Sequence, residues 1–306
     1  MDLLQDLALA RFTVDRAAAV RANPNWIEDA WQDPRTRILL VEHGKIPVTD
    51  DLSPILIPPS SFPVALDDLR EASVLLGLDD EHTYVAVFGH KDHLDEAAWV
   101  SLRDFGSTMS ARDVGLAITA TALATWHATH AFCPLCGGST QVAQAGWARH
   151  CEFDEKTHFP RTEPAMIVAV EDDQERILLG RRTGWEPTWF STLAGFVEAG
   201  ESCEAAVVRE VLEESGIHVD PKSLRYLGSQ PWPFPASLMM GYRAKALSTE
   251  VELHDDEMHE VKWFSRSEFE QACGAGELKL PNPTSIAWRL IEHWYGQELQ
   301  RSWSRA

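Results

Sequence analysis

One segment constrains the fold and the chemistry of this chain more than any other: residues 195–217 read GFVEAGESCEAAVVREVLEESGI. A glycine-containing loop leads into a stretch with helical periodicity, which ends at Gly216, a residue type that commonly terminates helices. Since a helix advances by roughly 100° per residue, Glu210, Glu213 and Glu214 share one face, where like charges destabilise the helix. The pattern therefore predicts either a solvated acidic face or a cation site whose bound ion offsets the repulsion.

The spacing within this segment favours the cation site. Gly195 is followed by five residues and Glu201, then by seven residues and Arg-Glu-Val at 209–211, by Glu-Glu at 213–214 and by Gly-Ile at 216–217. Every fixed position of the Nudix box is present at its spacing, so the chain resembles the Nudix hydrolases. This resemblance implies a divalent-metal-dependent enzyme that hydrolyses a nucleoside diphosphate linked to another group.

Carboxylate oxygens are the ligands that hard dications such as Mg²⁺ and Mn²⁺ prefer. We expect Glu210, Glu213 and Glu214 to be metal ligands, one of them also serving as the catalytic base. The backbone carbonyl of Ala194 is expected to supply a further ligand. Arg209, which lies in the same catalytic segment, is expected to pair with a neighbouring acid and fix its conformation.

A glutamate later in the chain often completes the metal site in the Nudix hydrolases. Here residues 254–260 read HDDEMHE and offer Glu257 and Glu260, of which we favour Glu257. The alternative for either residue is a solvated acid in front of a strand.

Residues 229–238 read SQPWPFPASL, and three prolines within five positions stiffen the segment that carries Trp232 and Phe234. Rigid aromatic side chains suit stacking on a flat ring, although composition alone also fits a surface turn over the core. The segment is similar to the SQPWPFPxS signature of NADH pyrophosphatases of the NudC type. That resemblance implies hydrolysis of NADH or NAD⁺ to reduced or oxidised nicotinamide mononucleotide plus AMP, and removal of NAD caps from RNA 5′ ends.

The same resemblance implies a set of substrate contacts in this chain: Phe159, Ser229, Gln230, Pro231, Trp232, Pro233, Phe234, Pro235, Ala236, Ser237 and Ala287. Within this set, Phe159 is expected to stack on a ring and Ala287 to line the pocket. Two positions depart from the common pattern, since Ala236 stands where many members carry Gln and Phe159 where a Tyr is common. We therefore expect one or two hydrogen bonds to the substrate to be absent here.

A cysteine pair, Cys133-x-x-Cys136, followed by Cys151, is similar to the zinc ribbon of the same enzymes, in which a second CxxC pair is usual. The fourth ligand position holds an aspartate, and a carboxylate is an accepted zinc ligand, while His150 and His158 are close alternatives. The alternative to a structural zinc is a set of reduced thiols packed without metal. The four expected zinc ligands are Cys133, Cys136, Cys151 and Asp154.

The order of strand-like and helical runs predicts three domains: an α+β domain over 1–125, a zinc-ribbon-like module over 126–161 and the Nudix catalytic domain over 162–306. In the first domain, strands are expected at 37–41 and 84–89 and a helix over 95–106, and a further helix over 115–130 leads into the cysteine segment. From Glu163 onward strands interleave with helices, which predicts an α/β or α+β sandwich. The resemblance to the Nudix hydrolases implies the first of these, the Nudix α/β/α sandwich.

The formal net charge of −20 argues against a protein that coats nucleic-acid phosphates with a broad basic surface. The sequence has neither a secretory signal pattern nor a run of 18 apolar residues, so we expect no membrane segment and a cytoplasmic location. Three clustered cysteines out of five suit a reducing compartment with a metal site. The resembling enzymes are homodimers, and 12 tryptophans are compatible with an apolar interface, so a homodimer is expected.

Two other functions remain open at this point. The chain is an enzyme for another nucleoside diphosphate derivative, such as ADP-ribose or a dinucleoside polyphosphate, if SQPWPFP serves only the fold. It is a nucleic-acid-binding zinc-ribbon protein if the Nudix domain is inactive, a function that the acidic charge and the intact set of glutamates disfavour.

Overall fold

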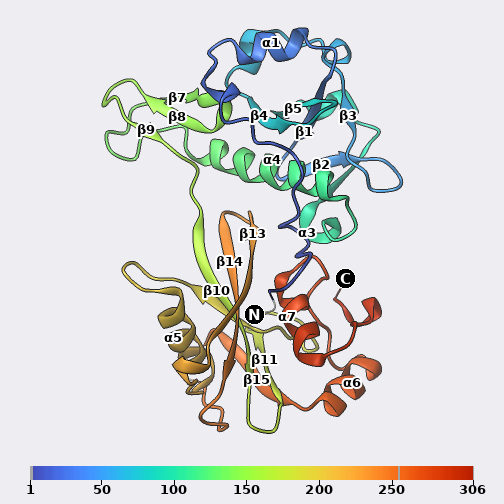
Figure 1. The fold of residues 1–306 in the computed structure, drawn as a ribbon, viewed down its shortest axis with the longest axis vertical. Coiled ribbons are helices and arrows are strands. Elements are labelled where there is room, and N and C mark those ends of the chain that lie inside the picture. Colours follow the sequence, from blue (N-terminus) through green and yellow to red (C-terminus); the bar gives the residue numbers. More distant parts are fainter. Residues whose placement is uncertain (1–2, 254–255, 306) are drawn as a thin grey trace. The chain divides into compact units, whose positions relative to one another are not determined.

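The structure is a computed structural model that describes residues 3–253 and 256–305 (Figure 1). The chain forms two compact units. The first unit takes in the described residues up to 10, residues 163–232 and those from 237 onward, and the second takes in residues 11–162 and 233–236. The two units are described one at a time.

A six-stranded sheet is the centre of the first unit, with the order β13-β14-β10-β11-β15 and with β12 paired to β10. The pairing of β10 with β14 is parallel, and the other pairings are antiparallel. The strands are β10 (Glu163–Glu171), β11 (Ile177–Arg182), β12 (Leu193–Phe196), β13 (Arg225–Trp232), β14 (Ser237–Lys245) and β15 (Met258–Phe264).

Helices cover both faces of this sheet, α5 (Cys203–Ser215) on one face and α7 (Ile286–Tyr295) with α6 (Arg266–Ala275) on the other (Figure 1). Strand β10 is buried on both sides because alternate side chains point to opposite faces. Met166 and Val168 join the core under α5, whereas Ile167 joins the core under α7. The expected α/β/α sandwich is confirmed.

Both ends of α5 follow from the local sequence. The Ser202 hydroxyl accepts a hydrogen bond from the Ala205 amide and caps the first turn. Gly216 ends the helix in the left-handed conformation, with φ of 70°, which costs a glycine little. Helix α7 buries Ile286, Leu290, Ile291 and Trp294, the apolar face that the sequence predicts.

The second unit contains a four-stranded sheet in the order β3-β1-β5-β4, a two-stranded β2-β6 pair and a three-stranded β7-β8-β9 sheet. Its strands are β1 (Thr36–Val41), β2 (Lys45–Val48), β3 (Leu56–Ile57), β4 (Ser73–Leu78), β5 (Thr83–Phe88), β6 (Ala98–Ser101), β7 (Thr140–Ala143), β8 (Ala148–Cys151) and β9 (Thr157–His158). Its helices are α1 (Trp26–Gln32), α2 (Leu66–Leu69), α3 (Leu102–Phe105) and α4 (Ala111–Thr129).

The sequence prediction of one helix over residues 95–106 is wrong. Residues Ala98–Ser101 form strand β6, which pairs antiparallel with β2 and places Val100 opposite Ile46. Only the short helix α3 follows. The strand forms because Trp99 and Val100 favour extended backbone and because Trp99 packs on the core of this unit.

Helix α4 is the longest helix of the second unit, and most of its residues are buried. It packs against β1, β4 and β5. The expected helix over 115–130 is thus confirmed. Within the described residues, no helix is at once long enough and apolar enough to cross a membrane.

Candidate active site

The three glutamates of α5 that are expected to bind metal, Glu210, Glu213 and Glu214, lie in different environments. The side chain of Glu214 is 4% exposed, that of Glu210 is 15% exposed and that of Glu213 is 54% exposed. Val207 and Val211 point into the core on the opposite side of the helix. The helix therefore separates an apolar face from a carboxylate face that grades from buried to solvated.

Arg209 contacts three of the nearby acids. Its guanidinium donates to both carboxylate oxygens of Glu201, at 2.9 and 2.8 Å, and to Glu213 at 2.9 Å. It also lies 2.9 Å from Glu210 and donates to the carbonyl of Phe196 at 2.9 Å. These contacts tie the loop before α5 to the acids on α5, as expected for a residue that fixes carboxylate conformation.

Gly195 of β12 lies against the carboxylate of Glu210. A Cβ added at Gly195 would lie 2.0 Å from the Glu210 Cδ atom, which explains why this position requires glycine. Burial raises the pKa of Glu210, and the neighbouring Arg209 opposes that shift. Ala194, whose carbonyl is an expected metal ligand, precedes Gly195 on the same strand and lines the adjacent cavity.

A second arginine, Arg182, lies at the end of β11 between two acids. Its Nη2 atom is 3.9 Å from Glu214 and forms an ion pair with Glu257. Glu260 pairs instead with Arg181, at 3.2 Å, and with Lys262. Of the two glutamates that the sequence offers for the end of the site, Glu257 is the one held near Glu214.

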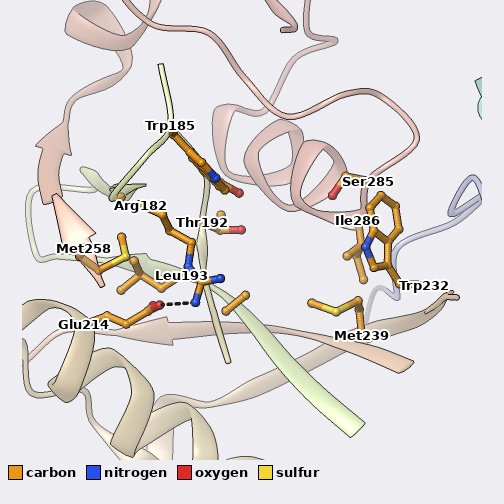
Figure 2. A pocket seen from close by; sticks show the side chains of 13 residues that line it. Arg182, Trp185, Thr192, Leu193, Glu214, Trp232, Met239, Met258, Ser285 and Ile286 are labelled. Atoms are coloured by element: carbon orange, nitrogen blue, oxygen red, sulfur yellow. Dashed lines mark ion pairs between the residues drawn. The ribbon is translucent and has the colours of Figure 1, made fainter. Parts of the chain in front are cut away.

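A cavity of about 190 Å³ opens beside these groups (Figure 2). Figure 2 shows Arg182 and Glu214 toward one end of the cavity and Trp232 with Ser285 toward the other. The lining residues are Gly180, Arg182, Trp185, Ser191, Thr192, Leu193, Ala194, Glu214, Trp232, Met239, Met258, Ser285 and Ile286. The cavity thus joins charged groups to two tryptophans and several apolar side chains, a combination typical of small-molecule sites.

Sequence reasoning found three residues of this lining, Ala194, Glu214 and Trp232, and missed the others. Arg182 and Trp185 are the missed residues with the most evident chemistry, since they bring a cation and a flat apolar ring. The run RILLGRR indicated a strand, but it gave no sign that the strand ends beside α5. Met239 and Ile286 were expected as parts of a strand and a helix, and not as pocket residues.

The carboxylates fit a hard dication in their chemistry, because they offer anionic oxygens beside a backbone carbonyl. They do not form a closed cage. In the described part of the chain, three or more His, Cys, Asp or Glu ligand atoms lie within 4.8 Å of one another only in the cysteine group of the second unit. This openness suits Mg²⁺, which keeps waters and takes substrate phosphates besides one or two carboxylates. Glu210, Glu213, Glu214 and Glu257 are the residues that would hold such ions.

Gln230, an expected substrate contact, is fully buried in the first unit. Its Nε2 atom donates to the carbonyl of Thr284 at 3.0 Å, and its Oε1 atom accepts from the Leu9 amide at 3.3 Å. Because Thr284 precedes Ser285 and Ile286, this amide positions one wall of the cavity. The geometry therefore favours a structural role for Gln230 over contact with the substrate.

The other expected substrate contacts differ in how deeply they are buried and in which unit they lie. Trp232 lines the cavity, whereas Ser237 and Ala287 are buried. Four more of the expected contacts are partly or fully buried: Ser229, Pro231, Pro233 and Ala236. In the second unit, Phe234 is joined to Pro235 by a cis peptide bond, and the Arg103 guanidinium lies 5.0 Å from its ring centroid. Phe159, also in the second unit, is exposed.

The expected zinc ligands meet in the second unit. Single ligand atoms of Cys133, Cys136, Cys151 and Asp154 all lie within 4.8 Å of one another. The thiol of Cys133 donates to Asp154 Oδ2 at 3.2 Å, and the thiols of Cys136 and Cys151 are 3.5 Å apart. Three thiols and one carboxylate form an accepted donor set for a tetrahedral zinc. His158 is also near, with Nε2 at 3.3 Å from the Cys133 sulfur.

Three family models match the chain, and together they span most of it. Residues 161–284 match the NUDIX domain, and residues 128–159 match the NADH pyrophosphatase zinc ribbon domain. Residues 35–126 match the NADH pyrophosphatase-like rudimentary NUDIX domain. The NUDIX match agrees with the resemblance to the Nudix hydrolases, and two of the three matched domains are described as those of NADH pyrophosphatases, as the resemblance in the sequence implies.

Curated relatives carry related names. The "NAD-capped RNA hydrolase NudC" of Mycobacterium tuberculosis is 43% identical over 204 residues, 64% of this chain and 64% of the relative. The human "NAD-capped RNA hydrolase NUDT12" is 36% identical over 195 residues, 60% of this chain and 42% of the relative. The match to the mycobacterial relatives thus covers less than two thirds of their length.

Solved structures of NUDIX hydrolases are also similar. The crystal structure of a NUDIX hydrolase from Nitrosomonas europaea is 22% identical, with a TM-score of 0.43. That similarity covers 54% of this chain and 93% of the other.

Proposed function

We propose that this chain is a divalent-metal-dependent hydrolase that cleaves the diphosphate of NADH or NAD⁺ into nicotinamide mononucleotide and AMP. We extend the proposal to the removal of NAD caps from RNA 5′ ends, the activity that the curated relatives are named for. The observation that carries the proposal is the cavity in which Glu214 and Arg182 lie together with Trp185 and Trp232. A dinucleotide needs both kinds of group, because it has a diphosphate and two flat rings.

The charged residues of the site are assigned to the metal ions and the diphosphate, and the tryptophans to the rings of the substrate. Bound dications would neutralise the diphosphate and lower the pKa of the attacking water. Glu210, Glu213, Glu214 and Glu257 would hold the ions, and Arg209 keeps Glu210 and Glu213 oriented. Glu213 is the most exposed of the three acids on α5 and is the one we assign to proton transfer. Trp185 and Trp232 line the cavity with flat rings, the kind of group on which a nicotinamide or adenine ring stacks.

Mass analysis of the reaction products tests this proposal directly. With Mn²⁺ present, NADH should give reduced nicotinamide mononucleotide and AMP, and NAD-capped RNA should give a 5′-monophosphate end. Without a divalent ion, both reactions should stop. A kcat/KM for ADP-ribose about tenfold or more above that for NADH would favour an enzyme for another nucleoside diphosphate derivative. No hydrolysis of any of these substrates would contradict the proposal.

We also propose a homodimer located in the cytoplasm. The large exposed side chains of Phe132, Leu135 and Phe153 on the zinc ribbon support an association surface. The free thiols of all five cysteines support a reducing compartment. A sizing column run at micromolar concentration tests the first point, and a fully active monomer would contradict it.

A further inference from the structure

The end of strand β11 carries two arginines that serve different neighbours. Strand β11 pairs with β15, where Arg181 stands opposite Glu260 and Arg182 stands opposite Met258, so the register shifts by one residue between them. Such an irregularity redirects the side chains that follow it. Arg181 therefore remains paired with Glu260, while Arg182 points into the cavity toward Glu214 (Figure 2).

Arg182 supplies the positive charge that offsets the negative charges of two acids in the site. Its guanidinium pairs with Glu257 and lies 3.9 Å from the nearly buried Glu214. One side chain thus compensates two glutamates that would otherwise repel each other across the open site.

A guanidinium and a dication compete for the same carboxylate oxygens. Two positive groups cannot both remain close to Glu214 and Glu257 without repelling each other, since the charges act over only a few ångströms. The Arg182 side chain is 43% exposed and long, so it has room to leave the acids when a dication arrives. Its nearest new anionic partner would be a diphosphate in the cavity that it lines, and arginine binds phosphate oxygens through two parallel hydrogen bonds.

We propose that Arg182 is a displaceable counter-ion. It neutralises Glu214 and Glu257 in the metal-free protein, yields them to the dication, and then binds an oxygen of the substrate diphosphate. This inference rests on the proposed function, since it takes the metal site and the diphosphate from it. It makes Arg182 a binding residue that couples metal loading to substrate binding.

The competition between Arg182 and the dication can be tested without any catalysis. Mn²⁺ is titrated into metal-free protein, and electron paramagnetic resonance measures the free ion. Arg182→Ala removes the competitor and should bind Mn²⁺ about three- to tenfold more tightly than the original protein. Arg182→Lys keeps the positive charge and should stay within about threefold. Arg181→Ala is the matched control, because Arg181 pairs with Glu260 and not with Glu214 or Glu257 as Arg182 does, and it should leave Mn²⁺ affinity unchanged.

Binding of inorganic pyrophosphate at saturating Mn²⁺ tests whether Arg182 binds the diphosphate. Arg182→Ala should bind pyrophosphate about tenfold more weakly, and Arg182→Lys should also bind it more weakly because the two-pronged donor is lost. Arg181→Ala should match the original protein.

The Mn²⁺ titration and the pyrophosphate titration together test the proposed role of Arg182. Unchanged or weaker Mn²⁺ binding by Arg182→Ala would overturn it, and so would unchanged pyrophosphate binding. A failure of the original protein to bind Mn²⁺ at all would instead overturn the proposed function. The experiment therefore separates an error in the role of Arg182 from an error in the site itself.

Discussion

The longest helices of the two units make a useful comparison, because each packs against a sheet but only one carries chemistry. Helix α4 is buried on most of its surface, and its only acid, Asp113, caps its first turn with Ser110. Helix α5 buries its apolar side chains on one side and places Glu210, Glu213 and Glu214, which range from buried to half exposed, on another. A helix enclosed by its own unit has no surface for a ligand, whereas a helix covered on one side retains one.

The polar groups of the two units differ in the same way. In the second unit, the buried Arg149 donates to Thr140, at 2.7 Å, and to His127, at 3.0 Å. His127 in turn contacts the carbonyl of Gly146 at 2.8 Å. Such a satisfied network stabilises a fold. In the first unit Glu214 lines a cavity, and the acids of the site depend on arginines for compensation, which leaves them available to a ligand.

The largest expected effect concerns the zinc ribbon, because a bound structural zinc contributes to the free energy of folding. Purified protein should contain close to one zinc per chain, and Cys151→Ala should lose the zinc and lower the Tm by at least about 5 °C. Zinc analysis and calorimetry measure both. Cys203→Ser, a change of a cysteine outside the ligand group, should keep the zinc. Less than about half an equivalent of zinc in the original protein would contradict the assignment.

Removing one carboxylate from α5 should affect activity far more than stability. Glu214→Gln should lower kcat/KM for NADH by at least about a hundredfold, because a metal ligand is lost while the side chain keeps its volume. Steady-state kinetics with Mn²⁺ measure this. Glu204→Gln, on the same helix but bonded to the Tyr242 hydroxyl, is the control and should stay within about threefold. Equal activity of both variants would show that the acids on this face do not hold the metal.

The buried His127 of the second unit should make the protein sensitive to acid. Burial lowers the pKa of this residue to about 4, against about 6.5 for an unfolded chain. As pH falls from about 6.5 to about 4, the unfolded chain binds a proton that the folded chain does not, so stability falls by up to about 3 kcal/mol. Urea unfolding at several pH values should show this loss in the original protein and not in His127→Gln. The exposed His43 is the control, and a His43→Gln variant should lose stability as the original protein does.

A smaller effect is expected where β12 touches α5. Gly195→Ala would bring a Cβ into the carboxylate of Glu210, so the acid must move and kcat/KM should fall by about tenfold. In contrast, nothing lies within 4 Å of a Cβ added at Gly274 of α6, and Gly274→Ala should leave activity intact. Full activity of Gly195→Ala would mean that Glu210 does not need the position seen here.

The sequence predicted those features that depend on local patterns. Helix α5 with its glycine end, the buried face of α7 and the meeting of three cysteines with Asp154 all follow from short-range spacing. In each case the residues that matter lie within one helix or one small module. Periodicity and motif spacing are therefore sufficient to find them.

What the sequence did not predict depends on contacts between distant segments. The direction of Arg182 follows from a register shift against β15, which no local pattern reveals. Gln230 stands in a substrate motif, yet its amide is used by Leu9 and Thr284 from the two ends of the chain. A motif identifies which residues matter, but only packing decides whether a side chain faces the ligand or supports the wall behind it.

The central claim is that the glutamates of α5 hold dications that bind a diphosphate. Anomalous diffraction from a crystal soaked with Mn²⁺ and AMP tests it most directly. We predict manganese peaks within coordination distance, about 2.0–2.3 Å, of carboxylate oxygens of Glu210 and Glu214, with a phosphate oxygen on the same ion. Carboxylates without a manganese neighbour, in a crystal where AMP occupies the cavity, would contradict the account.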